Sequence, residues 1–403
     1  MKIKYFTNTN PYADSTASGN RIICLLDGLK SEGLLVQVFV CGGVTTMKNR
    51  AAYSNTGVEI IYFSNIVLDS LYKRRFHKYI GKYLIRPIVK RKVNSELFDF
   101  IGIAWVDSGN DFLWRIIASK KNRSYKLITE MNEYLDIHLM NKGNLFQKFE
   151  GERRRRFFEN YFFHRIDGFA LMTRTLIEHY NGFPAPQPRM LHLPMTVDIE
   201  RFNQLAPSLT EFQKPYIAFV GVMNDAKDGV SNLIKAFNLI KEHFLEHKVY
   251  LVGAWNYDTP IHLDLIKSFG LEDRVFWMKE YSRDAIPSII GNADLLALPR
   301  PDSKQAQGGF PTKLGEYLAT GKPVCATTVG ELPDYLIDNE SVFFAQPGSV
   351  ESFADAMRRA LSEPENARRV GLNGKKVAQK EFNKDIQAKK LHQFLLELQD
   401  EKK

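Results

Sequence analysis

Short apolar runs alternate with segments of helical periodicity along almost the whole chain. Asn20–Glu32 is typical: its apolar residues recur at helical spacing, and Gly33 marks the end of the helix. Strands that alternate with helices in this way predict an open α/β domain with a parallel sheet. In the first half, the predicted strands are Ile3–Thr7, Val36–Val40, Val58–Phe63, Phe100–Trp105, Lys126–Thr129 and Gly168–Met172, and the other helices are Phe112–Ser119, Gln147–His164 and Leu176–Tyr180.

Low periodicity in the middle of the chain predicts a linker between two such domains. Asn181–Pro194 is rich in proline, and Glu200–Lys214 has little periodicity. A second alternation follows, with strands Tyr216–Val220, Val249–Val252, Val275–Trp277, Leu295–Leu298, Val324–Ala326 and Val342–Ala345 and helices Val230–His243, His262–Phe269, Arg283–Ile290, Thr312–Ala319, Val350–Leu361 and Glu365–Gln379. We predict one domain in residues 1–205, a second in 206–382, and a C-terminal helix in 383–403 that packs outside the second domain or back on the first.

The composition narrows the class of protein. With 403 residues, 44% hydrophobic and 25% charged, the chain is long enough for two domains and unlike disordered or fibrous proteins. Cys24, Cys41 and Cys325 form no C-x-x-C pair, which argues against a disulfide scaffold and a zinc knuckle. No apolar run approaches the ~18 residues of a membrane span, and Met1–Phe6 leads directly into a polar stretch. We therefore expect a cytoplasmic protein without a signal peptide.

The net charge of +9 belongs to the N-terminal half of the chain. Residues 1–205 hold 30 basic and 19 acidic side chains, whereas the remainder holds 25 and 27. Such an asymmetry predicts an anionic partner for one domain only. No segment resembles an RNA- or DNA-reading module, so we expect no nucleic-acid partner.

Part of this excess lies in a basic stretch, Leu71–Lys92, which has no acidic residue between Asp69 and Glu96. Its apolar and aromatic positions fall near helical spacing, which is typical of an amphipathic helix on an anionic membrane. A solvated helix with its apolar side in the core is the alternative. The membrane reading predicts a peripheral protein on the inner face of the membrane, in contact through Lys73, Arg74, Arg75, Lys78, Lys82 and Arg86.

The segment with the most specific chemistry is the glycine loop and helix at Gly308–Val324. Pro311 is a helix-start signal, and a helix that opens from a glycine loop presents the N–H groups of Thr312–Leu314 and the positive end of its dipole to an anion. Lys313 opposes the helix dipole, which makes sense where phosphate binds; a capped surface helix with an incidental lysine is the alternative. Glu316, one turn further on, has a carboxylate that accepts hydrogen bonds from sugar hydroxyls.

A second cation stands at the carboxyl end of a predicted strand. Tyr216–Val220 ends at Gly221, and the loop that follows carries Lys227 to the mouth of the next helix. Parallel α/β sheets bind ligands in the crevice beyond the carboxyl ends of their strands. No G-x-G-x-x-G follows a strand at the start of either domain, which argues against a dinucleotide enzyme. The two segments together favour a phosphate-bearing ligand in the second domain.

Five phrases of the chain, in order, resemble retaining glycosyltransferases of family 4. They are Leu193–Phe202, Leu251–Gly253, Ala293–Asp294 with Leu298–Pro299, Glu316–Ala319 and Gly321–Val324. The resemblance covers nearly the whole chain and implies the GT-B architecture, an α/β fold of two Rossmann-like parallel-sheet domains that face a central cleft. It implies a nucleotide diphosphate sugar donor in the C-terminal domain and an acceptor mainly in the N-terminal domain. It also implies hexosyl transfer with retention of configuration, and no metal or other cofactor.

The resemblance assigns roles to individual residues. Gly19 is implied to lie in a glycine loop that faces the donor; an ordinary helix entry is the alternative. Glu130 and Glu133 follow a strand near the implied sugar position, where one of them would orient the acceptor hydroxyl or take its proton, with solvated loop carboxylates as the alternative. Tyr281 is expected near the base. The predicted catalytic residues are Lys227, Glu130 and Glu133, and the predicted donor-binding residues are Gly19, Gly221, Lys227, Tyr281, Pro311, Thr312, Lys313, Leu314 and Glu316.

Two departures from the family pattern bear on activity. The family usually has an arginine after the strand-end glycine, where it holds the diphosphate together with the lysine, but Val222 stands there. The family often has two glutamates eight positions apart, and the position eight before Glu316 is Gly308.

The sequence leaves three hypotheses about function. The first is a glycosyltransferase of cell-envelope polysaccharide synthesis with a lipid-linked or glycan acceptor at the membrane. The others are a non-catalytic GT-B partner or scaffold and a nucleotide-sugar epimerase of the same fold.

Overall fold

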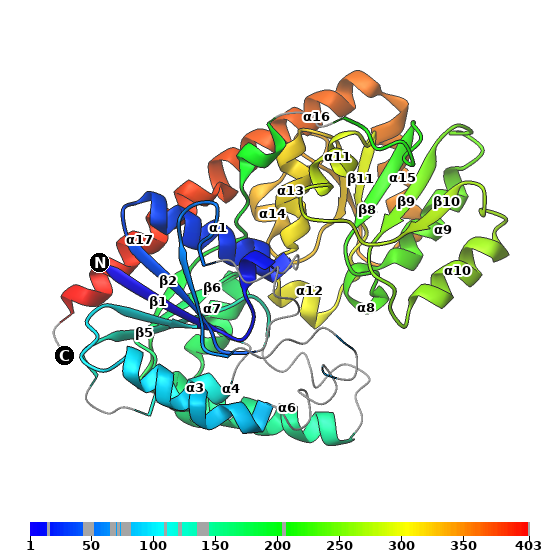
Figure 1. Ribbon diagram of the computed structural model, residues 1–403. Helices are drawn as coiled ribbons and strands as arrows, with labels where there is room; N and C mark the ends of the chain where they lie inside the picture. The colour runs from blue at the N-terminus through cyan, green and yellow to red at the C-terminus, as the bar shows by residue number, and fades with distance from the viewer. Residues whose placement is uncertain are drawn as a thin grey trace. The chain divides into compact units, whose positions relative to one another are not determined.

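The chain forms two compact units, each built on a parallel sheet (Figure 1). The computed structural model describes residues 1–13, 17–42, 52–64, 70, 73, 82–108, 111–119, 123–134, 145–203 and 207–401. Unit 1 comprises Met1–Pro194 and Asp385–Lys403, and unit 2 comprises Met195–Lys384. The alternation of apolar runs and helical stripes along the sequence thus becomes two α/β units in series.

Unit 1 contains a seven-stranded sheet in the order β3-β2-β1-β4-β5-β6-β7. Its strands are β1 (Lys2–Thr7), β2 (Leu35–Val40), β3 (Glu59–Tyr62), β4 (Ile103–Val106), β5 (Lys126–Met131), β6 (Gly168–Leu171) and β7 (Arg189–His192). Its helices include α1 (Ala17–Ser31), α3 (Lys82–Glu96), α4 (Asp111–Ile117), α6 (Leu145–Phe157), the π-helical η4 (Phe158–Phe162), α7 (Arg174–Asn181) and α17 (Lys384–Asp400), with short 3-10 turns at Pro11–Ala13 and Phe163–Arg165.

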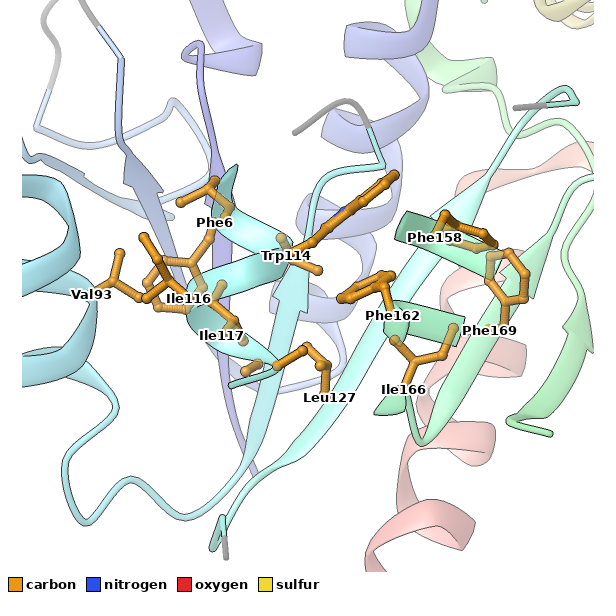
Figure 2. Close-up of a cluster of buried hydrophobic side chains, with 14 of the residues drawn as sticks. Phe6, Val93, Trp114, Ile116, Ile117, Leu127, Phe158, Phe162, Ile166 and Phe169 are labelled. Atoms are coloured by element: carbon orange, nitrogen blue, oxygen red, sulfur yellow. The ribbon is translucent and has the colours of Figure 1, made fainter. Parts of the chain in front are cut away.

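Helices cover both faces of this sheet, because successive side chains of a strand point to opposite sides. In β1, Tyr5 belongs to one core and Phe6 to the other. Figure 2 shows the core on the Phe6 side, where Trp114 of α4 stacks on Phe162 with ring centroids 4.8 Å apart. The indole N–H of Trp114 donates to the carbonyl of Asp107 over 3.0 Å, so the largest side chain of this core also satisfies its polar group.

The opposite core joins α1 to the C-terminal helix α17. Leu391, Leu395 and Leu398 of α17 are fully buried there. Gly168 of β6 makes this packing possible, since a Cβ atom at that position would lie 2.5 Å from Leu398 Cδ1. The C-terminal helix is therefore an integral part of unit 1.

Unit 2 contains a six-stranded parallel sheet in the order β10-β9-β8-β11-β12-β13. Its strands are β8 (Tyr216–Val220), β9 (Lys248–Val252), β10 (Val275–Met278), β11 (Leu295–Leu298), β12 (Val324–Thr327) and β13 (Phe343–Ala345). Its helices include α8 (Asp225–Asp228), α9 (Val230–Ile240), α10 (Thr259–Ser268), α11 (Ile286–Gly291), α12 (Lys304–Gly308), α13 (Thr312–Thr320), α14 (Leu332–Tyr335), α15 (Val350–Ser362) and α16 (Pro364–Val377), with a 3-10 turn at Ile199–Phe202 and a π-helical segment at Ala378–Phe382.

The order of the strands reverses between β8 and β11 in unit 2, as it does between β1 and β4 in unit 1. Ligands of such sheets bind at the carboxyl ends of the strands that flank this switch point. The carboxyl ends of β8 and β11 carry Gly221 and the pair Pro299–Arg300.

Three expectations about the fold differ from the structure. The proline-rich segment predicted as linker contains an edge strand, β7, which pairs with β6 from Gly168↔Arg189 onward. The division between the units falls at Pro194 and not at residue 205, because Met195 and Val197 pack against Gly315 of unit 2. The helix predicted over Gln147–His164 is α helical only to Phe157 and continues as π helix and 3-10 turn.

The burial of α17 predicts that replacing two neighbouring leucines by alanine has very different effects on stability. Leu398→Ala is expected to lower the free energy of unfolding of unit 1 by about 2–5 kcal/mol, because it leaves a cavity beneath Gly168. Leu396, which is 40% exposed on the same helix, is the matched control, and Leu396→Ala is expected to cost less than about 0.5 kcal/mol. Urea unfolding curves check both values. Equal losses from the two variants would contradict the packing described here.

Candidate functional site

The site in unit 2 begins where β8 ends. The hydroxyl of Tyr317 accepts a hydrogen bond of 2.7 Å from the N–H of Val220, which fixes α13 against the carboxyl end of β8. The next residue, Gly221, has a φ of +149°, and a Cβ atom there would lie 2.5 Å from Lys313 Nζ. Only glycine leaves room for this ammonium group. The two segments that the sequence picked out independently therefore meet at Gly221.

Lys313 is held by a buried carboxylate. Its Nζ lies 2.8 Å from Oδ1 of Asp228 and 4.2 Å from the centroid of the Phe219 ring. Burial lowers the pKa of Lys313, and the negative charge of Asp228 opposes that effect. The predicted anion-binding lysine thus has a carboxylate partner of its own.

Lys227 and Arg300 complete a group of cations around Asp228. Lys227 belongs to α8, whose N-cap Asn224 accepts the N–H of Lys227 over 2.9 Å. Arg300, at the end of β11, donates from Nε to the carbonyl of Lys227 over 3.2 Å. The charges of Arg300 and Lys227 both lower the pKa of Lys313, so the three cations share one electrostatic neighbourhood. The arrangement suits an anion that bears more than one negative charge.

The other predicted residues of α13 are partly engaged within the protein. The N–H of Leu314 donates to the carbonyl of Pro311 over 3.0 Å, and Glu316 Oε1 lies 3.3 Å from Nη1 of Arg201. Burial raises the pKa of Glu316, and the charges of Arg201 and Arg283 counteract this rise. Thr312 remains in the first turn of α13, where helical N–H groups lack intrahelical partners.

Tyr281 is tied to the segment that precedes β8. Its hydroxyl donates to Oε1 of Glu211 over 3.0 Å, and its ring lies 5.6 Å from that of Phe212. Burial, followed by the hydrogen bond to Glu211, raises the pKa of Tyr281 to about 12. Its placement near a nucleotide base stays a prediction.

In unit 1, the predicted residue Glu130 lies beside a buried arginine, Arg21, that was not predicted from the sequence. Glu130, near the end of β5, has Oε2 3.5 Å from Nε of Arg21. Arg21 also donates from Nη2 to the carbonyl of Leu193 over 2.7 Å and from Nη1 to that of Pro194. Burial raises the pKa of Glu130, and Arg21 opposes the rise. Glu133, beyond the strand, is only half-buried.

Gly19 does not lie in a loop. Helix α1 begins at Ala17, so Gly19 is a buried residue of its first turn, two positions before Arg21. The helix-entry alternative is therefore the correct description of its local structure. Its proximity to a donor stays a prediction.

The basic stretch is only partly described. Arg74, Arg75 and Lys78 lie outside the described residues. Lys73 is exposed, and its backbone N–H donates to Oγ of Ser70 over 3.2 Å. Lys82 begins α3, and the Arg86 guanidinium lies 4.9 Å from the centroid of the Phe112 ring.

Two features are absent from the described part of the chain. It contains no group of three or more His, Cys, Asp or Glu side chains able to hold a metal ion. None of its helices is long and apolar enough to span a membrane. The requirement for a metal stays untested.

A parallel sheet with cations gathered at its switch point is an arrangement typical of α/β proteins that bind anionic ligands. Residues 201–377 match the family described as Glycosyl transferases group 1. The fold resembles a solved structure over nearly the whole chain. Sucrose-phosphate synthase from Thermosynechococcus elongatus matches with a TM-score of 0.76 at 15% identity, and the match covers 99% of each chain. The fold is of the GT-B type, as the sequence phrases predicted, and residues 201–377 resemble that glycosyltransferase family.

Two curated relatives match about half of the chain. The MMP alpha-(1->4)-mannosyltransferase of Mycolicibacterium hassiacum is 26% identical over 201 residues, which are 49% of this chain and 46% of the relative. The GDP-mannose-dependent alpha-(1-6)-phosphatidylinositol monomannoside mannosyltransferase of Mycobacterium tuberculosis is 25% identical over 220 residues, or 52% of this chain and 56% of the relative. The matched part of the chain therefore spans about half the length of these relatives.

The ion pair between Lys313 and Asp228 makes a prediction for stability. Asp228→Asn is expected to lower the free energy of unfolding of unit 2 by about 3–5 kcal/mol, because it leaves a buried ammonium group without its carboxylate. Replacing both partners by apolar residues, Lys313→Met with Asp228→Leu, is expected to recover most of that loss. Asp355→Asn, in an exposed pair with Arg358, is the control and should change little. A double variant no more stable than Asp228→Asn would contradict this account of the pair.

Proposed function

We propose that the chain is a glycosyltransferase that moves a sugar from a nucleotide diphosphate sugar to a membrane-associated acceptor. The observation that carries the proposal is the group of three cations, Lys227, Arg300 and Lys313, at the switch point of unit 2, where Asp228 pairs with Lys313. A diphosphate is an anion of matching charge and size. Phosphate-binding cations at a helix start in a parallel sheet are the expected surroundings of such a group.

The chemistry follows from the charge that develops during transfer. As the bond between the sugar and the diphosphate breaks, negative charge grows on the departing oxygens, and fixed cations nearby lower the energy of that state. Lys227 and Lys313 fill this role, together with the N–H groups of the first turn of α13. We further propose that transfer proceeds with retention of configuration and without a metal ion, because these cations supply the stabilisation that a metal gives elsewhere.

Glu316 is proposed to bind the ribose. Its carboxylate is held from one side by Arg201 at 3.3 Å, and Arg201 in turn donates to the carbonyl of Arg283 over 2.8 Å. A carboxylate fixed in this way keeps acceptor capacity for two neighbouring hydroxyl groups. The guanidinium thereby orients the carboxylate and counteracts the rise that burial causes in the pKa of Glu316.

The class of acceptor is proposed from the relatives and from the surface of unit 1. The name of the Mycobacterium tuberculosis relative specifies a GDP-mannose donor and a phosphatidylinositol-linked acceptor. We propose a lipid-linked or surface-glycan precursor for this chain, a role in cell-envelope polysaccharide synthesis, and a peripheral position on the cytoplasmic face of the membrane. The nucleotide and the sugar are open to the assay below.

Helix α3 is proposed as the membrane contact. Leu84 and Ile88 are 64% and 54% exposed and four residues apart, so they share one face of the helix. Val89 and Val93 of the same helix are buried in the core. Lys90 and Arg91 are exposed beside the apolar pair. The helix thus has apolar side chains both in the core and outside it, which supports the membrane alternative over a helix that is only solvated.

The arginines of α6 do not contribute to this surface proposal. Arg155 pairs with Glu152 and Glu159 at 2.7 Å, and Arg156 pairs with Glu152 at 2.7 Å. Hydrogen bonds from Arg155 and Arg156 lower the pKa of Glu152 to about 2. These local pairs satisfy much of the charge of the helix, so we confine the proposed contact to α3 and the basic stretch that precedes it.

A panel of UDP- and GDP-sugars tests the proposed activity. The wild-type chain is expected to be stabilised against heat by at least one nucleotide and to transfer its sugar to a membrane extract, with the anomeric configuration of the product read by NMR. Lys227→Ala is expected to reduce turnover by about 100-fold or more, because it removes a cation from the departing diphosphate. Lys235→Ala, an exposed lysine of α9, is the control. Near-normal transfer by Lys227→Ala would refute the assignment, and sugar conversion without an acceptor would identify an epimerase.

Sedimentation with vesicles tests the proposed membrane contact. Vesicles with anionic lipid are expected to bind the chain, and the double variant Leu84→Glu with Ile88→Glu is expected to lower binding by about tenfold or more, since two apolar side chains no longer enter the interface. Leu372→Glu, at an exposed leucine of α16, is the control. Binding should weaken as salt is raised. Equal binding to neutral and anionic vesicles would contradict the proposal.

A further inference from the structure

The turn that carries Lys227 is too short to hold its own position. Helix α8 consists of four residues, Asp225–Asp228, and Gly229 ends it with a φ of +67°. A single helical turn is unstable by itself, because it fixes several backbone angles for few hydrogen bonds. The position of Lys227 at the switch point therefore depends on the contacts that other elements make with this turn.

The loop between β9 and α10 holds the start of the turn. The N–H of Asp225 donates to Oδ2 of Asp258 over 3.0 Å, and Nδ2 of Asn224 donates to the hydroxyl of Tyr257 over 2.6 Å. Asp258 is buried and directly precedes α10. Its carboxylate therefore fixes the backbone of α8 relative to α10.

The carboxylate of Asp225 is held by a second set of contacts. Nε2 of His262, in α10, lies 3.1 Å from Oδ1 of Asp225. The N–H of Ser231, in α9, donates to the same oxygen over 2.8 Å, and the Ser231 hydroxyl donates to the other oxygen, Oδ2. Burial alone would raise the pKa of Asp225, but the hydrogen bonds from His262 and Ser231 outweigh this effect and lower it. Two helices thus hold one side chain of α8.

The hydrogen bond to Asp225 is what the ring of His262 contributes beyond its volume. The residue is 1% exposed, and its Nδ1 has no hydrogen-bond partner among the described residues. Because a carboxylate only accepts hydrogen bonds, Nε2 is the nitrogen that donates. Burying a polar nitrogen without a partner costs free energy, so an apolar side chain of similar size would fill this space at a lower cost. The polar ring therefore serves its contact with α8.

We propose that His262 is a positioning residue for the transfer reaction: through Asp225 it fixes α8, and so holds Lys227 where the departing diphosphate gains charge. This inference rests on the proposed function. A cation stabilises such a charge efficiently when its position is fixed beforehand, and a misplacement of about 1 Å lowers rates by about 100-fold. The alternative is a purely structural contact, which stabilises unit 2 without affecting the position of Lys227.

Two variants of His262 separate its hydrogen bond from its packing. His262→Leu fills a similar volume without a donor, and it is expected to lower kcat with the nucleotide sugar that the panel identifies by about 30-fold. The KM for the acceptor is expected to change by less than about twofold. His262→Gln restores a donor near the position of Nε2, and its kcat is expected to remain within about threefold of wild type. Equal losses from the two variants would overturn the proposal.

A double variant tests whether His262 acts through Lys227. In the Lys227→Ala background the cation that His262 positions is gone, so adding His262→Leu is expected to lower kcat by less than about threefold further. Two losses that multiply would overturn the proposal, because the ring would then act on another part of the site. If His262→Leu does not fold, Ser231→Ala replaces it, with an expected loss of about fivefold that also disappears in the Lys227→Ala background.

Ser341→Ala is the matched control for stability. Ser341 is buried, and its Oγ accepts the N–H of Ile337 over 2.9 Å before the amino end of β13, at the opposite edge of the sheet from α8. This variant is expected to lower the thermal unfolding midpoint, as His262→Leu does, while its kcat stays within about twofold of wild type. A matching fall in kcat would mean that lost stability explains the effect of His262→Leu, and would overturn the proposal.

Calorimetry with inorganic pyrophosphate, UDP and GDP on the full chain separates this inference from the proposed function. A wild-type chain that binds none of the three probes and transfers no sugar would overturn the proposed function, and this inference with it. A wild-type chain that binds and transfers, together with a His262→Leu variant of equal kcat, would overturn this inference alone.

Discussion

The buried ion pair between Lys313 and Asp228 is the contact on which the site in unit 2 depends. At 2.8 Å it joins the first turn of α13 to the end of α8, two segments 85 positions apart in the sequence. The ammonium group occupies the space above Gly221 that any side chain there would fill. Because both partners are largely removed from water, neither is easily moved without the other. The position of the Lys313 ammonium group is therefore fixed within the protein, and such preorganised charge is the condition for efficient electrostatic stabilisation of a ligand.

Unit 1 also contains a buried ion pair, but the cation of that pair binds the backbone as well. Arg21 of α1 meets Glu130 of β5 at 3.5 Å, and its remaining donors hold the carbonyls of Leu193 and Pro194, where the chain leaves the unit. Here Arg21 uses its other donors to bind backbone carbonyls, so Glu130 has the properties of a structural carboxylate. Glu133, by contrast, is half-buried, and the catalytic role of either glutamate stays a prediction.

The fold was predictable from the sequence because its signals are local. The alternation of apolar runs and helical stripes fixes nearly all strands of both sheets, and Gly321 ends α13 with the positive φ that its type predicts. The edge strand β7 was missed because the prolines that flank it, at positions 184, 186, 188 and 194, are typical of a linker. The boundary between the units escaped because Met195 packs against Gly315, a contact across 120 positions that no local pattern reports.

The candidate site residues show the same difference between local signals and long-range contacts. Lys227, Lys313 and Gly221 were predicted as site residues because they stand at strand ends or helix starts, where ligands of such sheets bind. The partners that decide their chemistry were not found: Asp228 and Arg201 are ordinary charged residues until the fold brings them to Lys313 and Glu316. Arg300 did carry a signal, since it directly follows a predicted strand. A cation at that place in a domain with more acidic than basic residues is informative, because the net charge of such a domain does not attract an anion and local positive charge is needed for an anion to bind.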